Sequence, residues 1–204
     1  MMDSDEPLSH MIDVSFAVGG PCVPRAHRRA LSAALLQALP SLGDMPGFAV
    51  HPLKLSSAGE QTPLLSRRTR LTLRVPRERS AEVNQLVGRT LQVGDDCLTL
   101  GSAQARELVA HSTVFSHLVD NGEHDELAFL AAVDAALKSL DVKGRAICGR
   151  HQALDGEQLQ GYSLMVDGLT PAAALRVMES GLGQHHRLGC GVFVPHRSAV
   201  AVGT

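Results

Sequence analysis

The chain has 204 residues, which is enough for one large domain or two compact ones. Hydrophobic residues make up 44% of the sequence but aromatic residues only 3%, so a core has to be built from Leu, Val and Ala. The formal net charge of -2 argues by itself against a protein that holds nucleic acid through its overall charge.

The first part of the chain switches between strand and helix patterns. Apolar and polar residues alternate over Ile12–Val18, which predicts a half-buried strand. Apolar residues at helical spacing predict a helix over Leu31–Ala38, with Pro24 suited to its first turn. A second strand is expected over Phe48–Leu53, followed by a loop over Ser56–Ser66.

A second strand–helix–strand pattern completes the first half. The segment Arg70–Val75 alternates arginine or threonine with leucine or valine, which predicts a strand with Arg70 and Arg74 on its polar face. A short helix is expected over Ser80–Val87. Apolar residues on both sides of Gly94-Asp95-Asp96 indicate a hairpin.

The segment Ser102–Ser112 is the expected linker to the second half. It precedes a possible strand over Thr113–Val119. An apolar stripe over Leu130–Leu140, with acidic residues in the first turn, predicts a helix. Strands are expected over Arg145–Arg150 and Leu159–Val166, joined by a turn near residues 155–156.

The last helix has a clear start signal, because Thr170 suits the N-cap and Pro171 the first helical position. This helix should run to Gly181, and a final strand is expected over Gly191–Val194, ended by Pro195. Each half then reads strand, helix, strand, strand, helix, strand. The sequence therefore predicts an α+β protein with two ferredoxin-like (RRM-like) βαββαβ domains, at residues 1–101 and 113–204.

The arrangement of charge is more informative than its sum. All but three of the 19 basic residues are arginine, and six arginines fall within Arg67–Arg79, which holds a single acid. No acid follows Gly181, whereas acids gather between Asp120 and Asp134. Because planar guanidinium groups match phosphates, a basic binding face is one interpretation, and an ordinary solvated surface is the other.

The cysteine pattern and the N-terminal residues indicate the cellular compartment of the protein. The four cysteines show no metal-ligand or redox spacing. No apolar run reaches the length of a membrane span, and Met1–Glu6 is polar and acidic, unlike a signal peptide. A cytoplasmic protein without membrane contact is expected, and the absence of phosphate-loop and dinucleotide motifs predicts no cofactor.

The most distinctive stretch is Gly181–His196, where two Gly-apolar-Gly triplets bracket two histidines and an arginine. Glycine lets a chain turn sharply and lets its N–H groups approach a ligand closely. The stretch also fits a tight helix–strand connection, or a metal site made by His185, His186 and His196. Adjacent histidines on an extended segment point to opposite faces, and no carboxylate or CxxC completes a ligand set.

The G-h-G-x5-G-h-G pattern resembles the glycine-rich loop of the repeat-associated RNA-binding superfamily of CRISPR systems, and the chain most resembles the CRISPR repeat-RNA endoribonucleases. A second matching stretch is Val23–His27. The resemblance implies two tandem ferredoxin-like domains and cleavage of precursor guide RNA within its repeats, leaving 5′-hydroxyl and 2′,3′-cyclic phosphate ends. It also implies repeat RNA as ligand and further subunits of a CRISPR effector complex as partners.

Cleavage by the RNA's own 2′-hydroxyl needs a base, an acid and cations, and no metal ion. Spacing alone favours a core role for His27, but active histidines of this family commonly lie in or near the first helix, so His27 is the expected catalytic residue. The second catalytic group stays open, with His185 or His186 as possibilities. The residues expected to contact RNA are Arg25, Arg28, Arg29, Arg70, Arg74, Gly181, Gly183, His185, His186, Arg187, Gly189 and Gly191.

Two alternatives stand beside the nuclease. The first is a non-catalytic crRNA-binding subunit of a CRISPR effector complex, with the glycine-rich loop intact and His27 structural. The second is a tandem ferredoxin-like protein that binds a small molecule. A steep fall in repeat-RNA affinity with rising salt would exclude the second alternative.

Overall fold

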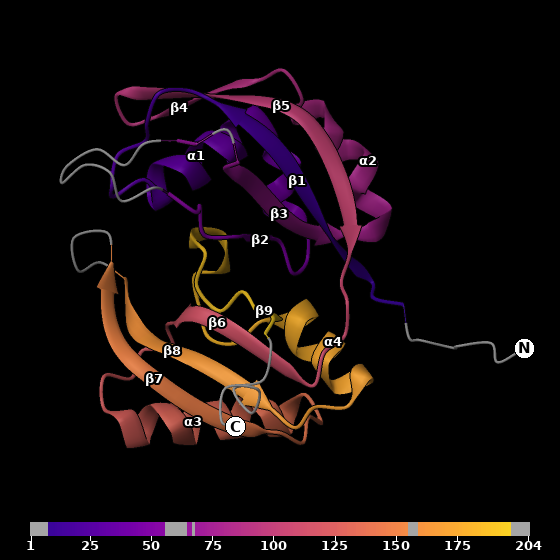
Figure 1. Ribbon diagram of the computed structural model, residues 1–204, viewed down its shortest axis with the longest axis vertical. Coiled ribbons are helices and arrows are strands. Elements are labelled where there is room, and N and C mark those ends of the chain that lie inside the picture. Colours follow the sequence, from indigo (N-terminus) through magenta and orange to yellow (C-terminus); the bar gives the residue numbers. More distant parts are fainter. Residues whose placement is uncertain (1–7, 56–64, 67, 155–158, 197–204) are drawn as a thin grey trace, which may run out of the picture.

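A computed structural model of the chain describes residues 8–55, 65–66, 68–154 and 159–196. The chain forms two antiparallel β-sheets, one from each half, and residues 181–193 run between them (Figure 1). The predicted loop over Ser56–Ser66 and the predicted turn near residues 155–156 fall largely outside the described residues.

The first half forms a five-stranded sheet in the order β2-β3-β1-β5-β4. Strands β1 and β3 pair through a continuous register from Met11 opposite Pro76 to Ala17 opposite Arg70. The elements are β1 (Met11–Gly19), α1 (Arg28–Ala38), β2 (Ala49–Val50), β3 (Arg70–Pro76), α2 (Ser80–Val83), β4 (Thr90–Val93) and β5 (Asp96–Glu107), with 3₁₀ helices at Pro40–Asp44, Arg77–Arg79 and Asn84–Leu86.

The second half forms a four-stranded sheet in the order β7-β8-β6-β9. Thr170 caps α4 through its hydroxyl, which accepts a hydrogen bond from the Ala173 amide, and Pro171 is the first helical residue, as predicted. The elements are β6 (Thr113–Val119), α3 (Glu126–Ser139), β7 (Arg145–Leu154), β8 (Leu159–Asp167), α4 (Pro171–Ser180), a 3₁₀ helix, η4 (His186–Leu188), and β9 (Val194–Pro195).

Both halves place their first and third strands in the middle of the sheet. In the first half β1 is the central strand, between β3 and β5, and in the second half β6 and β8 are the central pair. In each half one α-helix follows the first strand and another follows the third strand, which gives the predicted βαββαβ order. The first sheet has one additional strand, β4, at its edge. The α+β, tandem ferredoxin-like prediction is confirmed.

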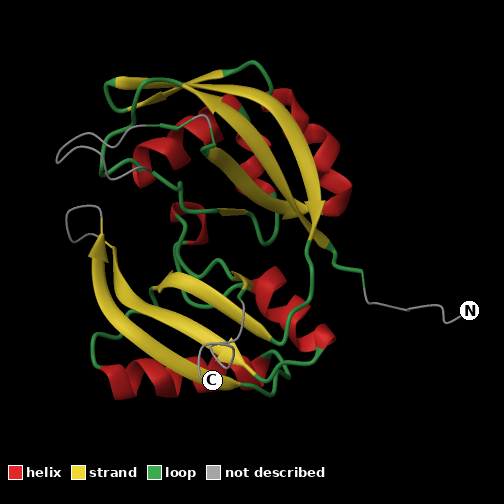
Figure 2. Cartoon of the chain, in the orientation of Figure 1, coloured by secondary structure: helices red, strands yellow, loops and turns green. Residues whose placement is uncertain are grey.

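Each sheet has its own apolar core. Leu31 and Leu35 of α1 pack against a first cluster that includes Val14 and Phe16 of β1. Helices α3 and α4 pack with β6 and β8 around a second cluster, and Figure 2 shows α3 along the outer side of the second sheet. Within the described part of the chain, no helix is long and apolar enough to span a membrane.

The predicted linker Ser102–Ser112 is wrong in its first part. Strand β5 continues through Glu107, which pairs with Ile12 of β1, so only residues 108–112 connect β5 to β6. The side chains of this extension are mostly exposed. The strand is held there by backbone pairing with β1 rather than by burial, so it leaves no apolar alternation in the sequence.

The predicted final strand exists, but its predicted start at Gly191 and its end before Pro195 are wrong. Residues 191–193 are not in a strand, and β9 consists of Val194 and Pro195 alone. Cys190, Val192 and Phe193 are nevertheless buried. The apolar run therefore reflects burial of an irregular segment between the two halves, not strand pairing.

Arg74 is the main correction among the predicted RNA contacts, because it is only 1% exposed. Its Nε and Nη2 donate to the two carboxylate oxygens of Asp13 at 2.8 and 3.0 Å. Its Nη1 donates to the carbonyl oxygens of Met178 and Phe193 at 2.7 and 2.8 Å. The second half covers this polar face of the first sheet, so Arg74 joins the two halves and is not available to phosphate.

Candidate functional site

The glycine-rich segment Gly181–Gly191 leaves helix α4 and turns back onto strand β6. The amide of Gly181 closes the helix by donating to the Val177 carbonyl at 3.0 Å. The amide of Gly191 donates to the Leu118 carbonyl at 2.7 Å. These amides are bonded within the protein, so the geometry does not support the predicted phosphate contact through them.

The glycines are required by close backbone contacts. Gly191 has φ +65°, and a Cβ there would lie 2.0 Å from the Leu182 carbonyl oxygen. Gly183 has φ +79°, and a Cβ there would lie 2.3 Å from the Asp120 carbonyl oxygen. Both the backbone conformation and the space exclude a side chain. The glycines therefore shape the segment and place its tip, residues 185–188, against the first half.

A substitution pair tests this account of the glycines. Gly191→Ala should lose about 1–3 kcal/mol to backbone strain, and more through the contact with the Leu182 carbonyl. Gly168→Ala is the control, because it has φ +75° but nothing within 4 Å of its Cβ position. Urea unfolding measures both. Equal losses in the two variants would contradict the packing role of Gly191.

Two arginines, one from each half, hold the tip of the segment against the first half. Nη1 of Arg28, at the start of α1, donates to the Leu188 carbonyl at 2.8 Å. Nη2 of Arg187 donates to the Gly43 carbonyl at 2.6 Å. The start of the first helix and the glycine-rich segment are therefore adjacent in the fold.

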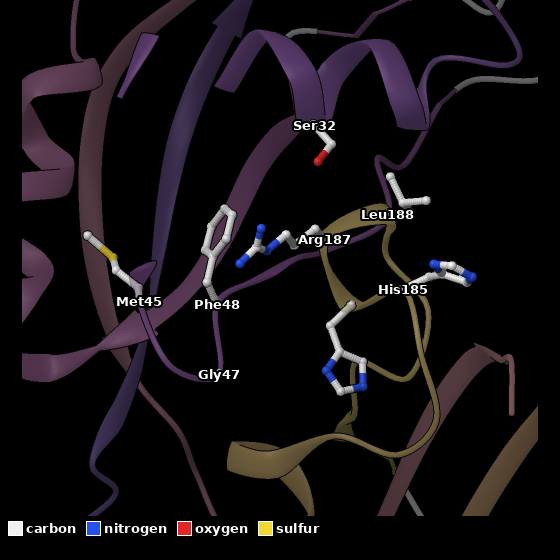
Figure 3. Close-up of a pocket in the computed structure, with 8 residues that line it drawn as sticks. Ser32, Met45, Gly47, Phe48, His185, Arg187 and Leu188 are labelled. Carbon is white, nitrogen blue, oxygen red and sulfur yellow. The ribbon is translucent and has the colours of Figure 1, made fainter. Parts of the chain in front are cut away.

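A pocket of about 490 Å³ lies between these parts of the chain. Figure 3 shows Arg187 extending from the glycine-rich segment toward Phe48, which follows the 3₁₀ helix Pro40–Asp44. The lining residues are Ser32, Met45, Gly47, Phe48, His185, His186, Arg187 and Leu188. The pocket therefore combines apolar side chains with a guanidinium group and two imidazoles.

His27 lies beside this pocket, at a second, smaller hollow. It is the N-cap residue of α1 and is 7% exposed. Its Nδ1 lies 3.0 Å from the Pro24 carbonyl and 3.2 Å from the Arg25 carbonyl. Because carbonyls only accept, Nδ1 carries a proton, and in the neutral ring Nε2 is then the basic nitrogen.

The hollow has a volume of about 10 Å³, which is room for about one water-sized group. It brings residues from α1, from the segment after β2 and from the glycine-rich segment to one place. Its lining residues are His27, Arg28, Leu31, Val50, His51, Pro52, Leu53, Arg187 and Leu188. Two cations therefore flank two imidazoles in an otherwise apolar setting.

His51 is the site residue that the sequence analysis missed. Its amide donates to the Thr72 carbonyl at 2.9 Å, which extends the pairing of β2 with β3. Its Nε2 lies 3.1 Å from Oδ1 of Asp13, whose carboxylate also receives Arg74. Burial acts to raise the pKa of Asp13, but hydrogen bonds from His51 and Arg74 hold it well below its usual range.

The other predicted arginines differ in their surroundings. Arg25, Arg29 and Arg70 are exposed, the first two next to His27 and the third at the start of β3. Farther along the predicted basic stretch, Arg77 pairs with Glu107 and Arg79 pairs with Glu82. The stretch is therefore not a continuous cationic face.

The two adjacent histidines also differ. His185 is exposed, adopts φ +61° and lies 3.8 Å from a carboxylate oxygen of Asp120. His186 is partly buried, and its Nε2 is the buried side-chain nitrogen left without a hydrogen-bond partner among the described residues. Burial lowers the pKa of His186, and a backbone hydrogen bond with Leu182 acts in the opposite direction. His186 is therefore held neutral within the segment.

The lowered pKa of His186 predicts a dependence of stability on pH. The unfolded chain binds this proton more readily than the folded one, so the stabilising contribution is present above about pH 6.5 and is lost as the pH falls. The free energy of unfolding of the wild type should therefore fall more steeply from pH 8 to pH 5 than that of His186→Gln. Parallel curves for the two proteins would contradict a lowered pKa at this residue.

The alternative of a metal site does not gain support from the fold. His196 follows β9, where its ring lies tilted against that of Phe115, apart from the turn that holds His185 and His186. Among the described residues, no three His, Cys, Asp or Glu side chains are grouped as metal ligands.

The same two-sheet architecture occurs in solved structures. One described as CRISPR associated protein Cas6 has a TM-score of 0.70 at 10% identity, covering 92% of this chain and 100% of that chain. Another, described as a RAMP protein binding different RNA substrates, has a TM-score of 0.62 at 15% identity, covering 90% and 98%. At these identities the likeness establishes the fold, which is that of tandem ferredoxin-like proteins.

Sequence comparison identifies the family. The CRISPR-associated endonuclease Cas6 of Myxococcus xanthus is 33% identical over 198 residues, which is 96% of this chain and 86% of that protein. The family model described as Cas6 Crispr matches residues 12–198. The chain belongs to the Cas6 family of CRISPR proteins, and the resemblance seen in its glycine-rich loop is confirmed.

Proposed function

We propose that this protein is a metal-independent endoribonuclease that binds CRISPR repeat stem-loops and cuts precursor crRNA into guide units. The products carry 5′-hydroxyl and 2′,3′-cyclic phosphate ends. Membership of a family with an endonuclease relative supports the activity class. The observation that carries the assignment is the shared hollow, where His27 of the first half meets Arg187 of the glycine-rich segment.

The chemistry needs only groups of the kind found at this hollow. The 2′-hydroxyl is an internal nucleophile, so cleavage requires its deprotonation, protonation of the 5′-oxygen and stabilisation of the charged phosphorane. His27 moves protons, and Arg28 and Arg187 lie close enough to stabilise negative charge on the phosphorane. The exposed Arg25, Arg29 and Arg70 hold the RNA backbone around the cleavage point.

The partners follow from the same proposal. The ligand is repeat RNA, in line with the fold neighbour described as binding RNA substrates. After cleavage the protein keeps the crRNA and joins other subunits of a CRISPR effector complex.

A cleavage assay with the wild-type protein tests the proposal. The substrate is the repeat RNA of the array encoded beside the gene, and the buffer contains a chelator. Cleavage should proceed at the same rate with and without divalent ions, and the upstream product should end in a 2′,3′-cyclic phosphate. A 3′-hydroxyl end, or loss of activity in chelator, would contradict the proposed chemistry.

One observation favours the non-catalytic alternative. His27 is largely buried and its Nδ1 is bonded to two backbone carbonyls, as expected for a structural histidine. In that case the protein binds the repeat and cuts nothing, and the wild-type assay separates the two functions directly.

A further inference from the structure

A second imidazole borders the hollow that holds His27. His51 enters it from the segment after β2, whereas His27 enters from the start of α1, and Arg28 and Arg187 line it as well. We propose that His51 is the second proton-transfer residue of the cleavage reaction, positioned by Asp13. This inference rests on the proposed nuclease function.

The orientation of His51 fits that role. Asp13 lies 3.1 Å from Nε2 of His51, and a carboxylate only accepts, so Nε2 carries a proton. In the neutral ring Nδ1 is then the basic nitrogen. The Asp13 carboxylate also stabilises the imidazolium that forms when Nδ1 takes a proton, which is the role an aspartate has beside a general-base histidine.

The surroundings keep this arrangement fixed. Arg74 binds both carboxylate oxygens of Asp13, so the carboxylate cannot rotate away from His51. Burial lowers the pKa of His51, Asp13 opposes this effect, and Arg74 and Lys54 add to it. His27, Arg28 and Arg187 are the remaining titratable or charged groups at the hollow. His51 is thus held neutral and ready to accept a proton.

The two histidines then have complementary roles. Nδ1 of His51 removes the proton of the 2′-hydroxyl, and the 2′-oxygen forms a bond to phosphorus. The bond from phosphorus to the 5′-oxygen breaks, and the imidazolium of His27 gives its proton to that oxygen. One proton is taken and one is given, so the products are the 2′,3′-cyclic phosphate and the 5′-hydroxyl, and exchange with solvent resets both rings.

The experiment compares His51→Asn and His51→Gln with the wild type and with His117→Ala, an exposed histidine on β6. Single-turnover cleavage of repeat RNA should be ~100-fold slower or more in both His51 variants, with unchanged repeat affinity and unchanged melting temperature. His117→Ala should cleave like the wild type. Wild-type cleavage rates in the His51 variants would overturn the inference.

A modified substrate assigns the roles. When sulfur replaces the 5′-oxygen at the cleaved bond, the leaving group no longer needs a proton. This substrate therefore restores the cleavage rate of a variant that lacks the general acid, but not that of a variant that lacks the general base. Rescue of His27→Ala but not of His51→Asn is expected. Rescue of His51→Asn would overturn its role as base. A wild-type protein that does not cleave would overturn the proposed function, whereas active His51 variants beside an inactive His27 variant overturn this inference alone.

Discussion

Replacing His27 with alanine is expected to slow repeat cleavage by ~10²–10⁴-fold while repeat affinity stays unchanged. The imidazole is the proposed proton-transfer group, whereas exposed arginines are proposed to hold the RNA. Nδ1 of His27 lies within hydrogen-bond distance of the Pro24 and Arg25 carbonyls of its own loop, and the arginines that hold RNA keep their positions when the imidazole is removed. Single-turnover rates and a binding titration with the same repeat RNA measure the two quantities.

A second substitution separates chemistry from folding. His27 is the N-cap of α1 but makes no side-chain cap hydrogen bond, and asparagine is among the best N-cap residues. His27→Asn should therefore keep a melting temperature close to that of the wild type and still lose cleavage, because an amide cannot transfer protons near neutral pH. A His27→Asn protein that cleaves like the wild type would show that the residue is structural and would favour a non-catalytic subunit.

Replacing Arg74 with alanine is expected to cost about 3–5 kcal/mol of folding free energy, the largest effect on stability among the substitutions considered. The change leaves the mostly buried Asp13 carboxylate without its bidentate partner, and it leaves the Met178 and Phe193 carbonyls without a donor. Urea unfolding measures the loss. Arg70→Ala is the matched control on the same strand, because Arg70 is exposed, and its effect should stay within about 0.5 kcal/mol.

The Arg74 substitution should also reduce cleavage, although Arg74 is not expected to touch RNA. Its bonds to Met178 and Phe193 fix the chain on either side of the glycine-rich segment. Without them the segment is no longer held against the first sheet, and His51 loses its fixed Asp13 partner. Arg74→Ala with the stability of Arg70→Ala and the cleavage rate of the wild type would contradict the role of Arg74 in joining the two halves.

Much of the fold could be predicted from local patterns. Strand β1 follows the alternation of Val14 and Phe16 with polar residues, and α4 begins at its Thr170 cap. The end of β5 could not be predicted, because backbone pairing with β1 holds it and its side chains are mostly exposed. The extent of β9 could not be predicted, because the apolar residues before it are buried without being in a strand. Periodicity reports which side chains are buried, and in neither segment does burial coincide with the strand.

The site was only partly predictable for a related reason. The family resemblance points to His27, and the structure places this residue at the same hollow as Arg187. The alternation of polar and apolar residues along β3 predicts that Arg74 faces solvent, but the second half of the chain covers the polar face of this strand at Arg74. His51 follows a two-residue strand, and Asp13 resembled any polar residue on an exposed face, so only the three-dimensional contact between them shows their partnership.

The most direct test of the account is a structure of the protein with repeat RNA that carries a 2′-deoxy nucleotide at the cleavage site, which binds but cannot react. We expect the cleavage-site phosphate to lie at the hollow between α1 and the glycine-rich segment, within hydrogen-bond reach of His27 and Arg187. A cleavage-site phosphate bound elsewhere, with His27 still packed away from the RNA, would contradict it.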